Sequence, residues 1–348
     1  MLGDCQAPPI WTRSPPALIP KNLSTDDMAV LPRPHWHATC LLQIDRASLS
    51  IFGWSFILLT EAPVAYRTPY SSCPICGVAE LSLLATADCT RHALWRPPLP
   101  ERLTWLRCNA CAHVFTDSFY TDAGLTVLFS RSYEAPLTEE AWEQQRFIWG
   151  PVVERILQVL PNREALFDGA LSWMDVGCGS GGLVFTASEF GFQATGLDLR
   201  EEMVRRLQEV GYRALYASIM NVQADKPLHV ISMADVLEHI PYPVGALQRA
   251  HELLDDQGVL FISCPNRECA SWQQMDRRSS NPYWAEFEHY HNFSRSTLTW
   301  TLRQCGFTPL SYSVSRRYIA CMEIIAVKGG VCKSGVPQCG SALSLEQH

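Results

Sequence analysis

The sequence predicts an α/β protein whose main domain is a doubly wound sheet, and two patterns carry that prediction. Short apolar segments alternate with amphipathic segments from residue 171 to residue 305, which is the order of strands and helices in a parallel sheet covered on both faces. The glycine-rich stretch Asp175–Gly182 stands between the first such strand and the first such helix. Glycines at this point let the backbone turn sharply and approach a bound nucleotide closely.

Each element of this sheet follows from its residue pattern. The predicted strands are 171–176, 194–199, 214–217, 229–236 and 259–263, and the predicted helices are 182–190, 201–210, 243–256 and 296–305. Alternating residues at 310–314 and 322–326 predict a terminal hairpin. Residues 139–160 predict a leading helix with a break at Gly150-Pro151, because proline lacks the N–H that a helix interior requires.

Two alternative cofactors are compatible with the glycine loop. Gly177, Gly179 and Gly182 match the dinucleotide fingerprint of NAD(P)-dependent oxidoreductases. Asp175 favours S-adenosylmethionine instead, because its carboxylate can hold the ammonium group of an amino-acid-like cofactor or the N–H groups of the loop. Asp198 ends the second strand, where a carboxylate can accept hydrogen bonds from both ribose hydroxyls.

Four motifs, in order and spacing, resemble the class I S-adenosylmethionine-dependent methyltransferases, and most closely the ubiquinone-biosynthesis type O-methyltransferases. They are Asp-Val-Gly-Cys-Gly-Ser-Gly at 175–181, Gly-Leu-Asp-Leu at 196–199, Ala-Asp-Val-Leu-Glu-His-Ile-Pro at 234–241 and Gly-Val-Leu-Phe-Ile-Ser-Cys-Pro-Asn at 258–266. The resemblance covers about residues 140–328 and implies a seven-stranded Rossmann-like sheet whose last strand is antiparallel. It implies methyl transfer to a small-molecule or biosynthetic-intermediate acceptor, with O-methylation slightly ahead of C- or N-methylation.

The resemblance also implies a set of cofactor-binding residues: Asp175, Gly177, Cys178, Gly179, Gly181, Asp198, Leu199, Ser218 and Asp235. Ser218 departs from the family pattern, since such enzymes often place an Asp there beside the adenine amino group. Cys178 is interpreted as a small filler rather than as a nucleophile.

Catalytic candidates begin after the fourth predicted strand. Asp235, Glu238 and His239 match the Glu-x-x-Glu-His positions of the ubiquinone-type enzymes. The match implies either a divalent cation held by these three residues or a base at His239. The alternative is that Glu238 and His239 cap the loop and Asp235 orders it.

A second group of catalytic candidates lies in residues 281–294, the stretch that lines the acceptor pocket in the family. Glu288, His289 and His291 are candidate bases or acceptor ligands. Histidine suits proton removal because its ordinary pKa is near the working pH. The alternative is a structural loop in which these histidines bind backbone carbonyls. Phe147 and Trp149 of the leading helix are candidates for a lid, although core packing is the preferred role for both.

Two Cys-x-x-Cys pairs upstream predict a zinc ribbon. Cys73, Cys76, Cys108 and Cys111 can close a tetrahedral shell of four thiolates, so the metal would be structural. The alternatives are redox dithiols, unrelated thiols, or iron in place of zinc. Nothing in the spacing favours three other possible ligands: Cys89, His92 and His113. A zinc-bearing scaffold without catalytic activity is a further alternative to a methyltransferase.

Composition limits the partners and the location. The net charge of −7 and the absence of a Lys/Arg run argue against nucleic acid or an anionic membrane as the main partner. The scattered cysteines and the lack of a legible secretory signal favour the reducing cytoplasm. The apolar run 51–60 is too short to cross a bilayer, although a membrane-surface anchor is an alternative. The expected organisation is a poorly ordered leader at 1–67, a zinc-ribbon-like module at 68–138, the methyltransferase domain at 139–328 and a flexible tail at 329–348.

Overall fold

A computed structural model describes residues 65–130, 139–161 and 163–329 of the chain. The predicted leader, apart from its last three residues, and the predicted tail, apart from Gly329, lie outside the described residues. None of the helices in this described part combines the length and the apolar character needed to span a membrane.

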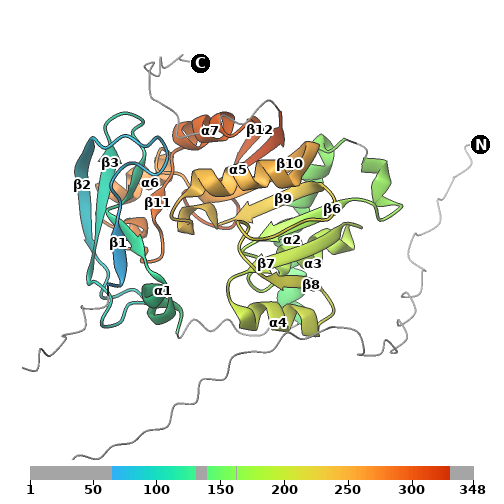
Figure 1. Ribbon diagram of the computed structural model, residues 1–348, viewed down its shortest axis with the longest axis horizontal. Helices are drawn as coiled ribbons and strands as arrows, with labels where there is room; N and C mark the ends of the chain where they lie inside the picture. The colour runs from blue at the N-terminus through green and yellow to red at the C-terminus, as the bar shows by residue number, and fades with distance from the viewer. Residues whose placement is uncertain (1–64, 131–138, 162, 330–348) are drawn as a thin grey trace, which may run out of the picture. The chain divides into compact units, whose positions relative to one another are not determined.

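A seven-stranded sheet forms the larger domain (Figure 1). Its strands are β6 (Ser172–Val176), β7 (Gln193–Asp198), β8 (Arg213–Tyr216), β9 (Leu228–Ala234), β10 (Leu254–Pro265), β12 (Phe307–Val314) and β13 (Cys321–Lys328). They lie in the order β12-β13-β10-β9-β6-β7-β8. Neighbours from β10 to β8 pair in parallel, whereas β13 is antiparallel to both β10 and β12. The predicted doubly wound sheet and its antiparallel last strand are confirmed.

Helices cover both faces of this sheet. They are α2 (Glu139–Val159), α3 (Gly182–Glu189), α4 (Glu201–Glu209), α5 (Pro243–Leu253) and α7 (Arg295–Gln304). Apolar side chains of α2, α3 and α4 share one cluster with Trp173 and Phe261 of the sheet. Those of α5 and α7 share another with Ile231 and Ile262. Burial of each large apolar side chain contributes about 1.5–3 kcal/mol, so the two layers hold the strand ends in fixed positions.

The strand order reverses between β6 and β9, and the region outside their carboxyl ends is called the crevice. The chain runs from β6 outward to β7 and β8, then returns to the other side of β6 to form β9 and β10. A reversal of this kind leaves space for a ligand outside the carboxyl ends of the strands. The glycine loop follows β6 and the Asp235–Pro241 stretch follows β9, so both border this crevice.

Two predicted boundaries are wrong. Helix α2 runs through Pro151 without the expected break, and the buried side chains of Val152, Val153 and Ile156 hold its second half against the sheet. Helix α5 ends at Leu253 rather than near residue 256, because the next residue, Leu254, already pairs with Leu228 of β9. In both places tertiary packing overrides the local signal.

The N-terminal module contains a four-stranded antiparallel sheet in the order β11-β4-β3-β2. Its elements are β1 (Arg67–Pro69), β2 (Leu81–Asp88), β3 (Arg102–Cys108), β4 (Val114–Thr116), β5 (Ser118–Tyr120) and α1 (Asp122–Phe129), with β1 paired to β5. The fourth strand, β11 (His291–Asn292), comes from the predicted acceptor stretch. The two predicted domains therefore share a sheet across the boundary drawn at residue 139.

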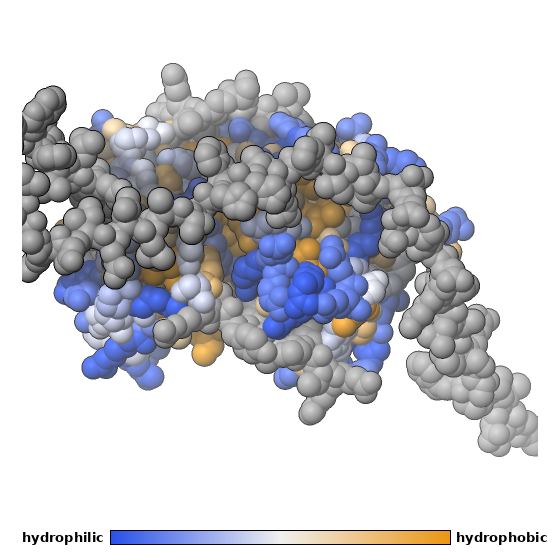
Figure 2. Space-filling model, turned by 60° about the horizontal axis from the view of Figure 1, so that its bottom comes forward, coloured by the Kyte–Doolittle hydropathy of each residue, from blue (hydrophilic) through white to orange (hydrophobic). Residues whose placement is uncertain are grey.

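Several short elements had no clear sequence signal. They are α6 (Ala270–Arg277) and the 3-10 turns η1 (Arg163–Leu166), η2 (Leu237–His239) and η3 (Pro282–Trp284). Figure 2 shows hydrophilic residues gathered over the part of the molecule where α4 lies. Within α4, Glu202 pairs with Arg205 and Arg206, so this charged face is a solvated surface with both signs interspersed.

Candidate functional site

The glycine loop after β6 has a backbone that requires glycine. Gly177, Gly179 and Gly181 have φ of 67°, 52° and 85°. A Cβ on Gly177 would lie 2.5 Å from the Val236 side chain, and one on Gly181 would lie 2.3 Å from Leu207. Side chains are therefore excluded, and the loop leads directly into the N-terminus of α3, where free N–H groups favour an anionic or electron-rich ligand.

Asp198 fastens the glycine loop to the end of β7. Its Oδ2 accepts a hydrogen bond from the Gly179 N–H at 2.9 Å. Its Oδ1 accepts from the backbone N–H of Arg200 at 2.9 Å, and the Arg200 guanidinium binds both oxygens. The carboxylate is buried and already fully engaged, so ribose hydroxyls would replace the guanidinium of Arg200.

Asp175 is buried beneath the loop and does not bind the loop N–H groups, which corrects one of its two expected roles. Its Oδ1 accepts a hydrogen bond of 2.6 Å from Ser232, and Ser232 in turn accepts from the Trp173 ring N–H at 2.8 Å. Burial raises the pKa of Asp175 to about 7, although the Ser232 hydrogen bond acts in the opposite direction. An ammonium group beside it would favour the ionised form.

The remaining predicted cofactor residues lie around the same crevice. Cys178 is buried with its sulfur against Gly196, and burial raises the pKa of its thiol, so it is a filler rather than a nucleophile. Leu199 is 65% exposed after β7 and offers an apolar surface. The Ser218 hydroxyl accepts a hydrogen bond from the Met220 N–H at 3.2 Å, and so closes the turn after β8.

Asp235 forms an ion pair that the sequence did not predict. Its backbone has a φ of 57°, a conformation that Asp adopts more readily than most residues. Arg317, from the turn between β12 and β13, donates to both Asp235 carboxylate oxygens. Arg317 lies outside the four motifs, so only the hairpin geometry brings it to this crevice.

Glu238, His239 and His289 form a group that can hold a cation, with ligand atoms all within 4.8 Å of one another. His239 Nδ1–H donates to the Glu288 carbonyl at 3.1 Å. Nε2 therefore carries the lone pair of the neutral ring and can accept a proton or bind a cation. Glu238 Oε2 and His289 Nδ1 are buried without a hydrogen-bond partner among the described residues. Asp235 does not belong to this group; the predicted set of Asp235, Glu238 and His239 is corrected accordingly.

Burial shifts the charges of this group. Burial, together with the nearby Asp235, raises the pKa of Glu238 well above its ordinary value. Burial and the neighbouring His239 lower the pKa of His289 well below its ordinary value. Both shifts favour the neutral forms, because two unpaired charges are costly to bury.

His291 connects the N-terminal module with the stretch that follows β9. Its Nε2–H donates to the Ile240 carbonyl at 2.9 Å, and its Nδ1 lies 3.1 Å from His113 Nε2. Burial lowers the pKa of His291 to about 4. With both ring nitrogens engaged inside the protein, the structural alternative is favoured for His291 over a role as base. The Glu288 backbone, not its side chain, makes the contact with His239.

Backbone hydrogen bonds continue this connection. Thr116 of β4 donates to the Tyr290 carbonyl at 2.9 Å, and Tyr290 donates to the Glu238 carbonyl at 2.8 Å. His92 of the module also binds Glu286, at 2.8 Å. The N-terminal module thus fixes the position of the backbone segments that carry Glu238 and His289.

The four cysteines of the module lie together and buried. Cys73 Sγ is 3.6 Å from Cys111 Sγ, and Cys76 Sγ is 3.5 Å from Cys108 Sγ. Sulfurs bound at about 2.3 Å to one tetrahedral zinc ion lie about 3.8 Å apart, so these separations fit that ion. Three further residues are outside the group: Cys89, His92 and His113.

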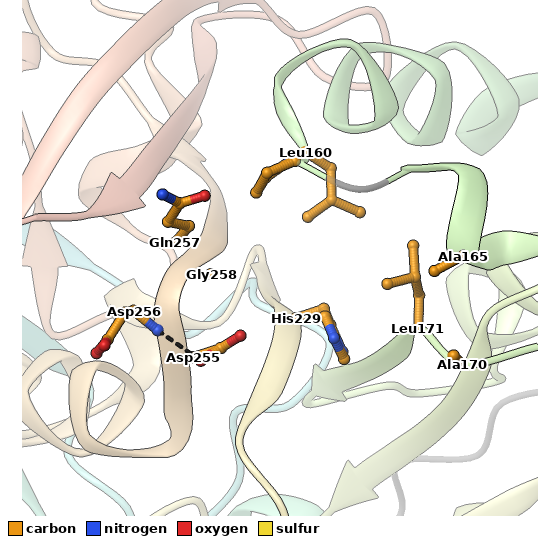
Figure 3. A pocket seen from close by; sticks show the side chains of 10 residues that line it. Leu160, Ala165, Ala170, Leu171, His229, Asp255, Asp256, Gln257 and Gly258 are labelled. Carbon is orange, nitrogen blue, oxygen red and sulfur yellow. Dashed lines mark hydrogen bonds between the residues drawn. The ribbon is translucent and has the colours of Figure 1, made fainter.

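Two cavities lie near these elements. One of about 340 Å³ is lined by Leu160, Leu171 and His229, among others (Figure 3). Leu171 and His229 stand at the amino ends of β6 and β9, so this cavity is at the opposite edge of the sheet from the glycine loop. Another of about 310 Å³ is bordered by Leu199 and Arg200 on one side and by Phe129 of α1 on the other, beside the cofactor residues.

Known proteins resemble this chain in its second half. Residues 141–312 match the family model for a methyltransferase domain. A ubiquinone biosynthesis O-methyltransferase of Nitrosospira multiformis is 35% identical over 107 residues, which is 28% of this chain and 45% of that protein. The Yersinia pestis protein of the same name is 32% identical over 126 residues, 34% of this chain and 51% of its own length. The chain thus spans about half the length of these curated relatives.

The solved structures that resemble this chain include a magnesium protoporphyrin IX methyltransferase from Synechocystis with bound S-adenosylhomocysteine. It is 16% identical, covers 60% of this chain and 95% of its own, and has a TM-score of 0.42.

Proposed function

Because this chain belongs, through residues 141–312, to the class I S-adenosylmethionine-dependent methyltransferases, we propose that it methylates a small-molecule acceptor, with an oxygen atom as the preferred acceptor. The observation that carries the proposal is the position of Glu238, His239 and His289 beside the crevice that holds the glycine loop. The likeness to ubiquinone biosynthesis O-methyltransferases supports an oxygen acceptor. The dinucleotide alternative finds no support among these relatives.

The residues around the glycine loop fit S-adenosylmethionine. The glycine bend at 177–181 gives close backbone approach, Asp198 offers two oxygens to ribose hydroxyls, and the exposed Leu199 can cover the adenine. Asp175 is buried beneath the loop, where its carboxylate can attract the positive charge of the cofactor from a distance without binding it directly. The cofactor supplies a methyl group that its sulfonium already activates, so the protein has to align the acceptor, exclude water and take up a proton.

The acceptor hydroxyl would lose its proton at the group formed by Glu238, His239 and His289. His239 can act as the base, because its Nδ1–H is held by the Glu288 carbonyl and Nε2 is left to accept. The same three side chains also fit a divalent cation, since Glu238 Oε2 and His289 Nδ1 have no other partner among the described residues. A cation bound there would orient an acceptor with two neighbouring oxygens and lower the pKa of the bound hydroxyl.

We assign the four cysteines of the N-terminal module to a structural zinc ion. The short sulfur–sulfur distances and the burial of all four side chains support this assignment. A shell of four thiolates leaves no open position, so the ion would hold the module together and take no part in methyl transfer. Localisation in the cytoplasm stays a prediction.

The experiment that tests the function is labelling of a metabolite extract with methyl-labelled S-adenosylmethionine and the purified protein. We expect label in one class of small molecules, and most of it should be lost when His239 is replaced by Gln. Calorimetric titration with S-adenosylhomocysteine and NADH accompanies it. Binding of NADH alone would favour the oxidoreductase, and cofactor binding without any labelled acceptor would favour a scaffold without catalysis.

A further inference from the structure

The ion pair between Asp235 and Arg317 stands at the carboxyl end of β9. Asp235 N–H donates to the Ser263 carbonyl at 2.9 Å, and Ser263 Oγ donates to Asp235 Oδ1 at 2.6 Å. The Arg317 guanidinium contacts both carboxylate oxygens and also the Ser263 hydroxyl. The hairpin between β12 and β13 is therefore fastened to the crevice by one guanidinium.

Neighbouring side chains connect this ion pair with both ends of the glycine loop. Val236, next to Asp235, lies so close to Gly177 that a Cβ there would be 2.5 Å away. On the other side, the Arg317 guanidinium lies 4.2 Å from the centre of the Trp149 ring. Trp149 donates to Gln145 at 2.9 Å, and Gln145 covers Gly182 at the start of α3. The pair is thus connected with the first glycine of the loop through Val236 and with the start of α3 through Trp149 and Gln145.

The guanidinium has binding capacity that the protein does not use. The Arg317 side chain is 9% exposed, and its Nε has no hydrogen-bond acceptor among the described residues. The nearest carboxylate to Nε, that of Glu323, is 3.8 Å away. Arg317 also acts to lower the pKa of Asp175, so its positive field reaches the floor of the loop. A buried cation with a spare N–H beside a partly buried anion is a matched receptor for a zwitterion.

We propose that Asp235 and Arg317 bind the two charges of the cofactor's amino-acid end, a step that rests on the proposed function. The α-ammonium takes the place of the guanidinium on Asp235, and the α-carboxylate takes the place of Asp235 on Arg317. Each charge keeps a counterion throughout this exchange, so the large cost of leaving the buried guanidinium unpaired is avoided. Arginine also suits the carboxylate because its planar N–H groups bind both oxygens.

A purely structural role for Arg317 makes a different prediction. If the guanidinium only fastened the hairpin, its loss would affect every ligand of the crevice alike. If it binds the α-carboxylate, only ligands with an amino-acid end would be affected. S-adenosylhomocysteine and 5′-methylthioadenosine separate these cases, because the second keeps the nucleoside and the sulfur but lacks the amino acid.

The test is calorimetric titration of the full chain with these two compounds. For Arg317→Gln we expect the affinity for S-adenosylhomocysteine to fall about 10- to 100-fold, while that for 5′-methylthioadenosine stays within about threefold. Arg317→Lys should recover part of the loss. Arg155→Gln is the matched control, since Arg155 binds Glu323 and Ser313 on the same hairpin strands without touching Asp235. It should leave both affinities unchanged.

Two outcomes would overturn the inference: an equal loss for both compounds, or no loss for either. Should Arg317→Gln fail to fold, Asp235→Asn provides the same comparison and must also weaken only S-adenosylhomocysteine. A wild-type protein that binds neither compound would instead contradict the proposed function. Failure of the inference and failure of the function are thus distinguishable.

Discussion

Asp198 and Arg200 form a bidentate ion pair at the ribose position that we propose. Arg200 Nε lies 3.0 Å from Asp198 Oδ1, and Nη2 lies 3.0 Å from Oδ2. Asp198 is buried, whereas the Arg200 side chain is 30% exposed. Because the carboxylate is buried, ribose hydroxyls can take this place only by replacing the hydrogen bonds of the guanidinium, so that Asp198 keeps its partners.

Asp198→Ala should weaken S-adenosylhomocysteine binding about 10- to 100-fold, because each hydrogen bond to a charged group contributes about 1.5–3 kcal/mol. Isothermal titration measures the change. Arg200→Gln is the control, because it removes the ion pair and keeps the carboxylate; its affinity should stay within about threefold of the wild type or improve. Unchanged affinity in Asp198→Ala would remove this residue from the cofactor site.

His239→Gln should abolish most methyl transfer and leave cofactor binding intact. General base catalysis contributes about 100- to 10,000-fold to a rate, so we expect a loss within that range. Transfer of label into the acceptor fraction measures turnover, and titration with S-adenosylhomocysteine measures binding. His229→Gln, at the opposite edge of the sheet, is the matched control. Normal turnover in both His239→Gln and His289→Gln would place the proton acceptor elsewhere.

Mn²⁺ binding to variants distinguishes the group of Glu238, His239 and His289 from the set that includes Asp235, which was expected from sequence. Electron paramagnetic resonance should detect Mn²⁺ bound to the wild-type protein. Binding should be lost in Glu238→Gln and weakened in His289→Gln, because each removes a ligand atom of the group. It should persist in Asp235→Asn, because Asp235 is engaged with Arg317. Loss of Mn²⁺ binding in Asp235→Asn would instead show that Asp235 is a ligand, as the sequence predicted.

Cys73→Ser or Cys108→Ser should reduce zinc content and destabilise the N-terminal module. Elemental analysis of freshly purified protein measures the metal, and near one zinc ion per chain is expected for the wild type. Cys89→Ser is the control, because Cys89 is also buried in this module but stands outside the group. Cofactor affinity should be largely retained in all three variants. Wild-type protein without metal would contradict the assignment.

Asp175 should make stability depend on pH. Burial raises the pKa of its carboxyl from 3.8 to about 7 on folding. Between these values the folded protein holds a proton that the unfolded chain has released, so stability decreases as the pH rises through this window. The slope for one group is at most about 1.4 kcal/mol per pH unit.

Urea unfolding at pH 5, 6 and 7 measures that slope, and Asp175→Asn should reduce it, since the amide keeps the Ser232 hydrogen bond and does not titrate. An identical slope in both proteins would show that Asp175 is ionised in the folded state.

Local patterns predicted most of the sheet. The strand and helix limits around the glycine loop agree with the structure to within a few residues, because these elements bury apolar faces with clear periodicity. The pattern did not predict that α2 continues through Pro151, since the stabilising contacts come from the sheet and not from the helix itself. It also did not predict β11, a two-residue strand whose partner lies in the N-terminal module.

The chain by itself determined its fold class, its glycine bend and its two cysteine pairs, because short-range spacing encodes all three. Only the tertiary structure decided which charged groups meet. Asp235 pairs with Arg317 from a hairpin 82 residues away, and His289 joins Glu238 where Asp235 was expected. Such pairings depend on which strand ends the sheet brings together, and no local pattern contains that information.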